Sequence, residues 1–125
     1  MREIKFKVWD IKRKRMLDSQ DIVFNNGVFY EDYRDFEDGI VLVNIVVMQC
    51  TGRKDKNGVG IFEKDIVKIN VDDAFDYVDG IGFVDWYEKK SEYAIFSKGE
   101  PWIPLSIQGE IEVIGNIYEN PELLD

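Results

Sequence analysis

The chain contains no histidine, and Cys50 is its single cysteine among 125 residues. Without histidine it lacks the commonest general base and the usual imidazole ligand of transition metals. Ser-His and Cys-His nucleophile systems and Cys/His zinc sites are therefore excluded within the chain. One cysteine cannot form an internal disulfide, and because Cys50 follows an apolar stretch, we expect it to be a buried structural thiol.

Long apolar runs and nucleotide-binding glycine patterns are also missing. The longest apolar stretch, residues 40–48, is interrupted by Asn44 and is far shorter than the roughly 20 residues that cross a bilayer. Its apolar residues on both faces predict one buried strand. The N-terminus does not have the pattern of a secretory signal, and Gly52, Gly58 and Gly60 do not have the spacing of a phosphate-binding loop. We therefore expect a cytoplasmic protein with no membrane segment and no bound cofactor.

Acidic side chains are in excess, and they are unevenly distributed. Asp and Glu number 25 against 16 Lys and Arg, for a formal net charge of −9. Residues 1–15 and 53–68 are net basic, whereas residues 18–38 carry seven acidic side chains against Arg34. Three interpretations remain open. In the first, the acids form a solvated surface. In the second, the basic segments pair with acidic segments within one chain or between subunits. In the third, the basic segments bind nucleic-acid phosphates despite the net negative charge of the chain.

Short apolar segments separated by glycine turns predict a mainly β protein. Lysines alternate with Ile4, Phe6 and Val8 in the pattern of a half-buried strand. Asn25-Asn26-Gly27 predicts a tight hairpin, and residues 33–36 fit a helical turn. We predict one domain, residues 1–125, forming a single small barrel or sandwich with SH3-like elements and at most one or two short helices.

The expected core consists of apolar residues from these strands. It comprises Ile4, Phe6, Val8, Ile45, Val47, Ile66, Val67, Val84, Ile95, Val113 and Ile117.

Carboxylates are the main remaining acid–base groups. The four aspartates of residues 72–79 do not have EF-hand spacing, so we expect an exposed acidic connector and no metal site. Glu63 and Asp65 flank Lys64 at a turn, where we expect them to accept backbone N–H groups. A metal-dependent enzyme built on carboxylates remains a third, minor hypothesis for the function.

The segment 48–67 supplies most of the candidate interaction residues. Its turn-forming residues predict an ordered loop packed near the C-terminal strand. Its cations would suit an acidic partner, and exposed tryptophans are common at contact surfaces. The candidates are Arg53, Lys54, Lys56, Trp9 and Trp86.

Four blocks of sequence resemble one family. Two of them, MQCTGRKDKNGVGIFEKDIV at 48–67 and EVIGNIYENPEL at 112–123, are specific, and KFKVWD near the N-terminus and GFVDW at 82–86 accompany them. Together they resemble the YopX-like proteins of phages and prophages. The chain departs from the family pattern at Cys50, Arg53, Gly60 and Lys64. Lys64 stands where the family has glycine, so we expect a turn of another type there.

The resemblance implies a small, mainly β protein of a phage or prophage, working in the cytoplasm of a bacterial host. It supplies no catalytic residue, substrate or cofactor. We therefore expect a non-catalytic binding or assembly module that forms a homo-oligomer or binds a host or phage protein. The alternative is a nucleic-acid-binding accessory protein that uses the basic segments 5–15 and 53–68.

Overall fold

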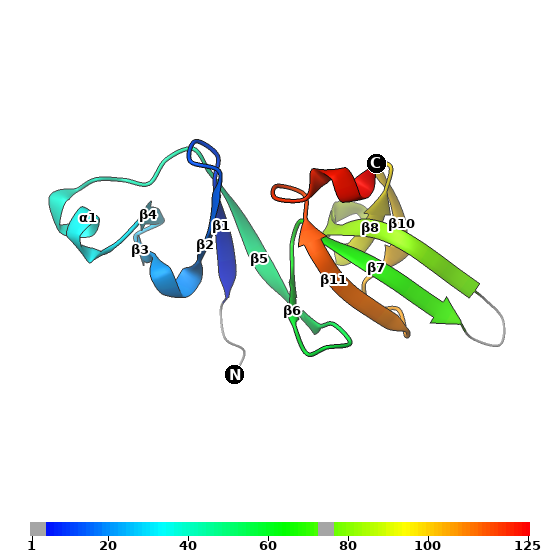
Figure 1. The fold of residues 1–125 in the computed structure, drawn as a ribbon. Helices are drawn as coiled ribbons and strands as arrows, with labels where there is room; N and C mark the ends of the chain where they lie inside the picture. Colours follow the sequence, from blue (N-terminus) through cyan, green and yellow to red (C-terminus); the bar gives the residue numbers. More distant parts are fainter. Residues whose placement is uncertain (1–4, 73–76) are drawn as a thin grey trace. The chain divides into compact units, whose positions relative to one another are not determined.

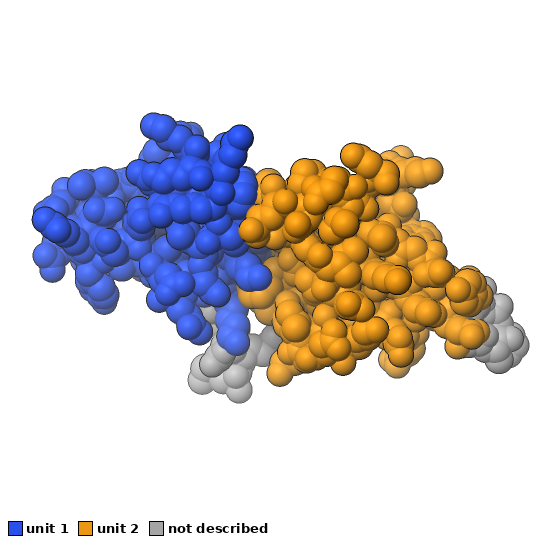
Figure 2. Space-filling view, viewed as in Figure 1, with its two compact units in different colours: residues 1–49 blue, residues 50–125 orange. Residues whose placement is uncertain are grey.

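The computed structural model describes residues 5–72 and 77–125, and most of them lie in β-strands (Figure 1). The mainly β prediction is confirmed, and the described residues contain one α-helix, of six residues. None of the helices in those ranges is long and apolar enough to cross a bilayer. The chain divides into two compact units, Met1–Gln49 and Cys50–Asp125, coloured separately in Figure 2. That these form one domain stays a prediction.

Unit 1 is built from short strands and one helix. Strand β1 pairs antiparallel with β2 on one side and with the first half of β5 on the other. Strands β3 and β4 form a separate hairpin. The bounds are β1 Phe6–Asp10, β2 Arg15–Asp18, the 3-10 turn η1 Ser19–Asp21, β3 Val23–Asn25, β4 Val28–Tyr30, α1 Tyr33–Asp38 and β5 Ile45–Lys54.

Local sequence determines two features of unit 1. Asn26 and Gly27 have φ angles of 51° and 77°, the positive values of the two-residue turn that joins twisted strands. In α1, the carboxylate of Asp32 accepts the N–H of Asp35 at 2.8 Å, and Gly39 ends the helix at φ 71°. Both the hairpin and the helical turn are therefore confirmed.

The core of unit 1 differs in part from the expectation. Val8 is fully buried, and the Phe6 ring packs edge-on against Phe29 with centroids 5.5 Å apart. Ile45 is only half-buried, and the prediction that Val47 is buried is wrong, because its side chain is 38% exposed next to the buried Met48. One face of β5 is open here, whereas the continuous apolar run had indicated cover on both faces. The expectation for Ile4 lies outside the described residues.

Unit 2 contains a curved five-stranded sheet and one further strand. The strand order β10-β9-β8-β7-β11 places the first strand of the sheet between its second and its last. This order is that of the SH3-like elements that the sequence predicts. The bounds are β6 Gly60–Phe62, β7 Asp65–Asp72, β8 Tyr77–Tyr87, η2 Glu88–Lys90, β9 Glu92–Ser97, β10 Glu100–Pro104, β11 Glu110–Asn116 and η3 Pro121–Leu124.

The core of unit 2 lies on the inner face of this sheet. Val67, Val84 and Ile95 are fully buried, as expected, and Val113 packs against them from β11. Ile66 is buried as well, outside this cluster. Residues such as Ile69 and Ile111 complete the core, although the sequence patterns did not single them out. Cys50 is half-buried rather than buried, opposite Phe62 on β6.

Lys64 occupies the turn between β6 and β7 with φ 70°, so the expectation of another turn type is wrong. Its N–H donates to the Val84 carbonyl at 2.7 Å, and its own carbonyl accepts the N–H of Ile117 at 3.0 Å. Its Nζ also pairs with Asp85. These contacts hold the lysine in a conformation that favours glycine.

We expect Lys64→Gly to be more stable than Lys64→Val by about 1 kcal/mol or more. Both substitutions remove the ion pair with Asp85, so their difference reports the cost of a positive φ for a β-branched residue, reduced by the greater freedom of unfolded glycine. Urea denaturation of the two variants measures it. Equal midpoints and slopes would contradict the left-handed geometry at this turn.

Candidate interaction site

Asp55 organises the loop that follows β5. Its side chain is 8% exposed. Oδ1 accepts the N–H groups of Asn57 and Val59, each at 2.9 Å, and Oδ2 accepts the N–H of Val113 at 3.0 Å. Burial alone would raise the pKa of Asp55. The three N–H bonds lower it by more, so the pKa lies below its usual value. Residues 55–59 are thereby joined to β11, which confirms that this part of the segment 48–67 packs near the C-terminal strand. The prediction that the whole segment is a loop is wrong, because residues 48–54 belong to β5 and residues 60–62 form β6.

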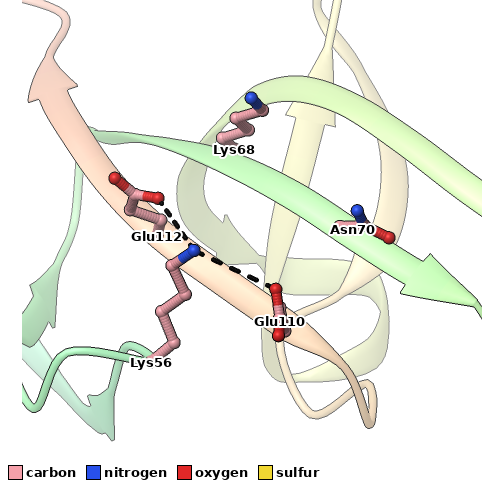
Figure 3. Close-up of a pocket in the computed structure, with 5 residues that line it drawn as sticks. All are labelled: Lys56, Lys68, Asn70, Glu110 and Glu112. Carbon is pink, nitrogen blue, oxygen red and sulfur yellow. Dashed lines mark ion pairs between the residues drawn. The ribbon is translucent and has the colours of Figure 1, made fainter.

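Lys56 lies over the outer face of β7 and β11 (Figure 3). Its Nζ is 3.2 Å from Glu112 and 3.9 Å from Glu110. Hydrogen bonding to Glu112 raises the pKa of Lys56. Lys68 and Asn70 stand opposite these two glutamates in the register and complete a hollow of about 100 Å³. This polar hollow is smaller than ordinary ligand sites of roughly 300–1,000 Å³, and it is crossed by the side chain of Lys56.

The other two candidate cations, Arg53 and Lys54, lie at the end of β5 and have different surroundings. Nη1 of Arg53 donates to the carbonyl of Leu105, which follows β10. Lys54 is exposed at the end of β5. The three predicted interaction residues of the loop are therefore neighbours in sequence, but Arg53 and Lys56 are each bonded within unit 2.

We expect Arg53→Ala to lower the free energy of unfolding by about 1 kcal/mol, because the substitution removes the charged donor that bonds to the Leu105 carbonyl. The matched change Lys54→Ala should alter it by less than about 0.5 kcal/mol. Thermal unfolding followed by circular dichroism compares the two. Equal effects would show that the guanidinium contributes no more than an exposed charge.

The two candidate tryptophans differ in exposure. Trp9, in β1 of unit 1, is 8% exposed and belongs to the core. Trp86, in β8 of unit 2, is 44% exposed, and its ring packs edge-on against Tyr93 with centroids 5.1 Å apart. Trp86 therefore has the surface that a contact needs, whereas Trp9 has a structural position.

The basic turn between β1 and β2 pairs with acids of its own chain. Asp10 is 2% exposed and accepts the N–H of Arg13 at 3.1 Å and Nε of Arg15 at 3.3 Å. Nη2 of Arg15 lies 2.9 Å from Glu31, a member of the acidic segment 18–38. Burial raises the pKa of Asp10, and these bonds lower it by more. For Arg13 and Arg15, pairing within the chain is thus the correct interpretation.

Residues 40–43, here called the 40–43 edge, connect α1 to β5 (Figure 1). Three of their four apolar side chains are exposed. Ile40, Val41 and Val43 are 56%, 46% and 62% exposed, whereas Leu42 is 9% exposed. A hollow of about 160 Å³ beside them is also lined by charged residues of unit 1, namely Asp10, Lys12, Arg13, Glu31 and Asp35.

Sequence reasoning missed this edge because it assigned residues 40–48 to one buried strand. The available signals were Gly39, which ends α1, and Asn44, which has φ 56° and separates the edge from β5.

The buried carboxylates take part in hydrogen bonds that shape the fold. No cluster of three or more metal-ligating residues occurs within the ranges 5–72 and 77–125. Asp65 accepts the N–H of Phe62 at 2.8 Å, as expected for a residue that shapes the turn. Asp10 and Asp55 are likewise used in hydrogen bonds of the fold. Of the four aspartates predicted to form an acidic connector, Asp73 and Asp76 lie outside the described residues.

Comparison with known proteins identifies relatives of this chain. It is similar over its whole length to protein EF1440 from Enterococcus faecalis, whose whole chain is also covered, with 24% identity and a TM-score of 0.59. It is similar over 97% of its length to protein yopX from Bacillus subtilis, of which 98% is covered, with 22% identity and a TM-score of 0.52. No curated protein was found to match. The model of the YopX protein family matches residues 5–125, and the chain therefore belongs to that family.

Proposed function

We propose that the protein is a non-catalytic binding module that assembles with another protein chain through the 40–43 edge. The observation that carries the proposal is the exposure of Ile40, Val41 and Val43 side by side in an ordered segment. Contiguous exposed apolar side chains with a charged border are characteristic of protein contact sites. The partner is a host or phage protein, or a second copy of the chain, in the bacterial cytoplasm.

The charge distribution favours a protein partner over nucleic acid. Arg13, Arg15 and Lys56, three of the cations that a phosphate-binding face would use, each pair with carboxylates of the same unit. The chain as a whole carries a formal net charge of −9, which repels a phosphate backbone. Nucleic-acid binding through the segments 5–15 and 53–68 is therefore an outcome that the test must detect, and not our proposal.

Photo-cross-linking in bacterial cells tests the proposal. A benzophenone amino acid replaces Val43 in one variant and Glu100, an exposed residue of β10, in a control variant. We expect discrete adducts from position 43 that survive nuclease treatment and are absent from the control. Nuclease-sensitive adducts would support the nucleic-acid alternative, and the same adducts from both positions would contradict a specific protein surface.

A further inference from the structure

We propose that the occupant of the 40–43 edge is the same edge of a second copy, paired antiparallel around a two-fold axis at Leu42. This inference rests on the proposed function and specifies its partner. It follows from the hydrogen bonds, the register and the charges of unit 1.

Hydrogen bonds within unit 1 use only one side of the edge. The N–H of Ile40 donates to the Asp35 carbonyl and the N–H of Leu42 to the Phe29 carbonyl, each at 2.8 Å. The carbonyl of Asn44 accepts the N–H of Ile11 at 3.0 Å. The bond from Ile40 closes the end of α1, and Asn44 has φ 56°, so the bond from Leu42 to Phe29 gives the direction of the edge's own lateral bonding. In an extended chain, alternate residues direct their N–H and C=O groups to opposite sides.

Val41 and Val43 therefore direct their backbone groups to the other side. Among residues 5–72 and 77–125, no partner bonds to the N–H of either valine. A segment beside the strands that has free N–H and C=O groups and exposed β-branched side chains is a template for another strand. Its ideal occupant is a second extended segment.

Two copies of this edge match each other in one register. When Val41 of one copy stands opposite Val43 of the other, each pair can exchange two N–H···O=C bonds, and the two-fold axis makes both pairs equivalent. The exposed valine side chains then lie on one face as cross-strand pairs. Leu42 lies at the axis and keeps its place in the core of its own unit.

The charges at the two ends of the edge are complementary in the antiparallel orientation only. The bond from Ile40 to Asp35 places α1 and its acids beside the start of the edge. The bond from Ile11 to Asn44 places Lys12 beside its end. Antiparallel pairing sets position 40 of one copy opposite position 44 of the other, so the acidic end meets the basic end twice. Parallel pairing would bring like charges together.

The expected dimer is weak. Four residues of each copy and the charged side chains beside them form a contact smaller than the 1,200–2,000 Å² of ordinary stable interfaces, so association should depend on concentration and on salt.

Sedimentation velocity of the wild type and of charge variants over a concentration series tests the inference. Lys12→Glu alone places two acids together at both ends, and Asp35→Lys alone places two cations together, so each variant should sediment as a monomer. An equimolar mixture should associate at least as well as the wild type, because both ends then carry opposite charges. Val43→Lys, which adds a charge to the edge itself, should remain monomeric.

Circular dichroism spectra and thermal unfolding verify that each variant is folded. A wild type that stays monomeric throughout the series, or a mixture that does not associate, would overturn the second-copy inference. If position 43 still cross-links to a different protein, the proposed binding function stands and only its occupant changes. If it yields no specific protein adduct and the wild type is also monomeric, both fail.

Discussion

Asp55→Asn is expected to destabilise the protein by about 3 kcal/mol, because the buried carboxylate accepts three backbone N–H groups. The amide has nearly the same shape, but its NH₂ group is a donor and must face at least one of these N–H groups. Either the 55–59 loop loses its bonds or Val113 loses its partner. Urea denaturation at neutral pH measures the change in the free energy of unfolding.

Asp38→Asn is the matched control for this experiment. Asp38 is exposed at the end of α1, so the same chemical change should cost less than about 0.5 kcal/mol. Equal effects at positions 38 and 55 would show that the negative charge of Asp55 has no special role in the loop.

The same bonds predict an acid-sensitive fold. The pKa values of Asp10, Asp55 and Glu31 all lie below their usual values in the folded protein. Their stabilisation is therefore fully present above the unfolded pKa of about 4 and is lost as the pH falls through the lower folded values. Unfolding free energies measured between neutral and acidic pH should show this decline. Asp55→Asn should show a shallower one.

Ile95→Ala is expected to have an effect of similar size, about 3 kcal/mol, because Ile95 is fully buried in the core of unit 2 and its truncation leaves a cavity. Val47→Ala should cost less than about 0.5 kcal/mol, since Val47 is 38% exposed. The sequence patterns predicted that both residues are buried, whereas in the structure only Ile95 is. The comparison therefore tests the exposed position of Val47. Similar losses of stability at both positions would favour the pattern over the structure.

Local sequence patterns predicted those parts of the fold in which a residue type has a single common structural role. Asn26-Gly27 specifies the two-residue turn. The alternation of Phe6 and Val8 with lysines specifies a strand, although Trp9 and Asp10 on β1 are buried as well. For unit 2, the sequence of strand-like segments indicated SH3-like elements, but the strand order was not predicted. Lys64 shows the limit of this reasoning, because its strained φ is maintained by Val84, Ile117 and Asp85, which are distant in sequence.

The candidate site was less predictable than the fold. The cations of residues 53–56 were visible in the sequence, but their partners Leu105, Glu110 and Glu112 could be assigned only once the strands were paired. The 40–43 edge has the composition of a core strand. Gly39 and Asn44 mark its two ends, but its exposure and its hydrogen bonds depend on where Phe29 and Ile11 lie.

Amide hydrogen exchange of wild-type protein at low and high concentration tests the central claim most directly. We expect the Leu42 amide to be protected at both concentrations, since it bonds to Phe29 within its own unit. The amides of Val41 and Val43 should exchange quickly in dilute solution and become protected together as the concentration rises. If the protection of these two amides does not change with concentration, and the protein also binds no other partner, the 40–43 edge is not an assembly surface.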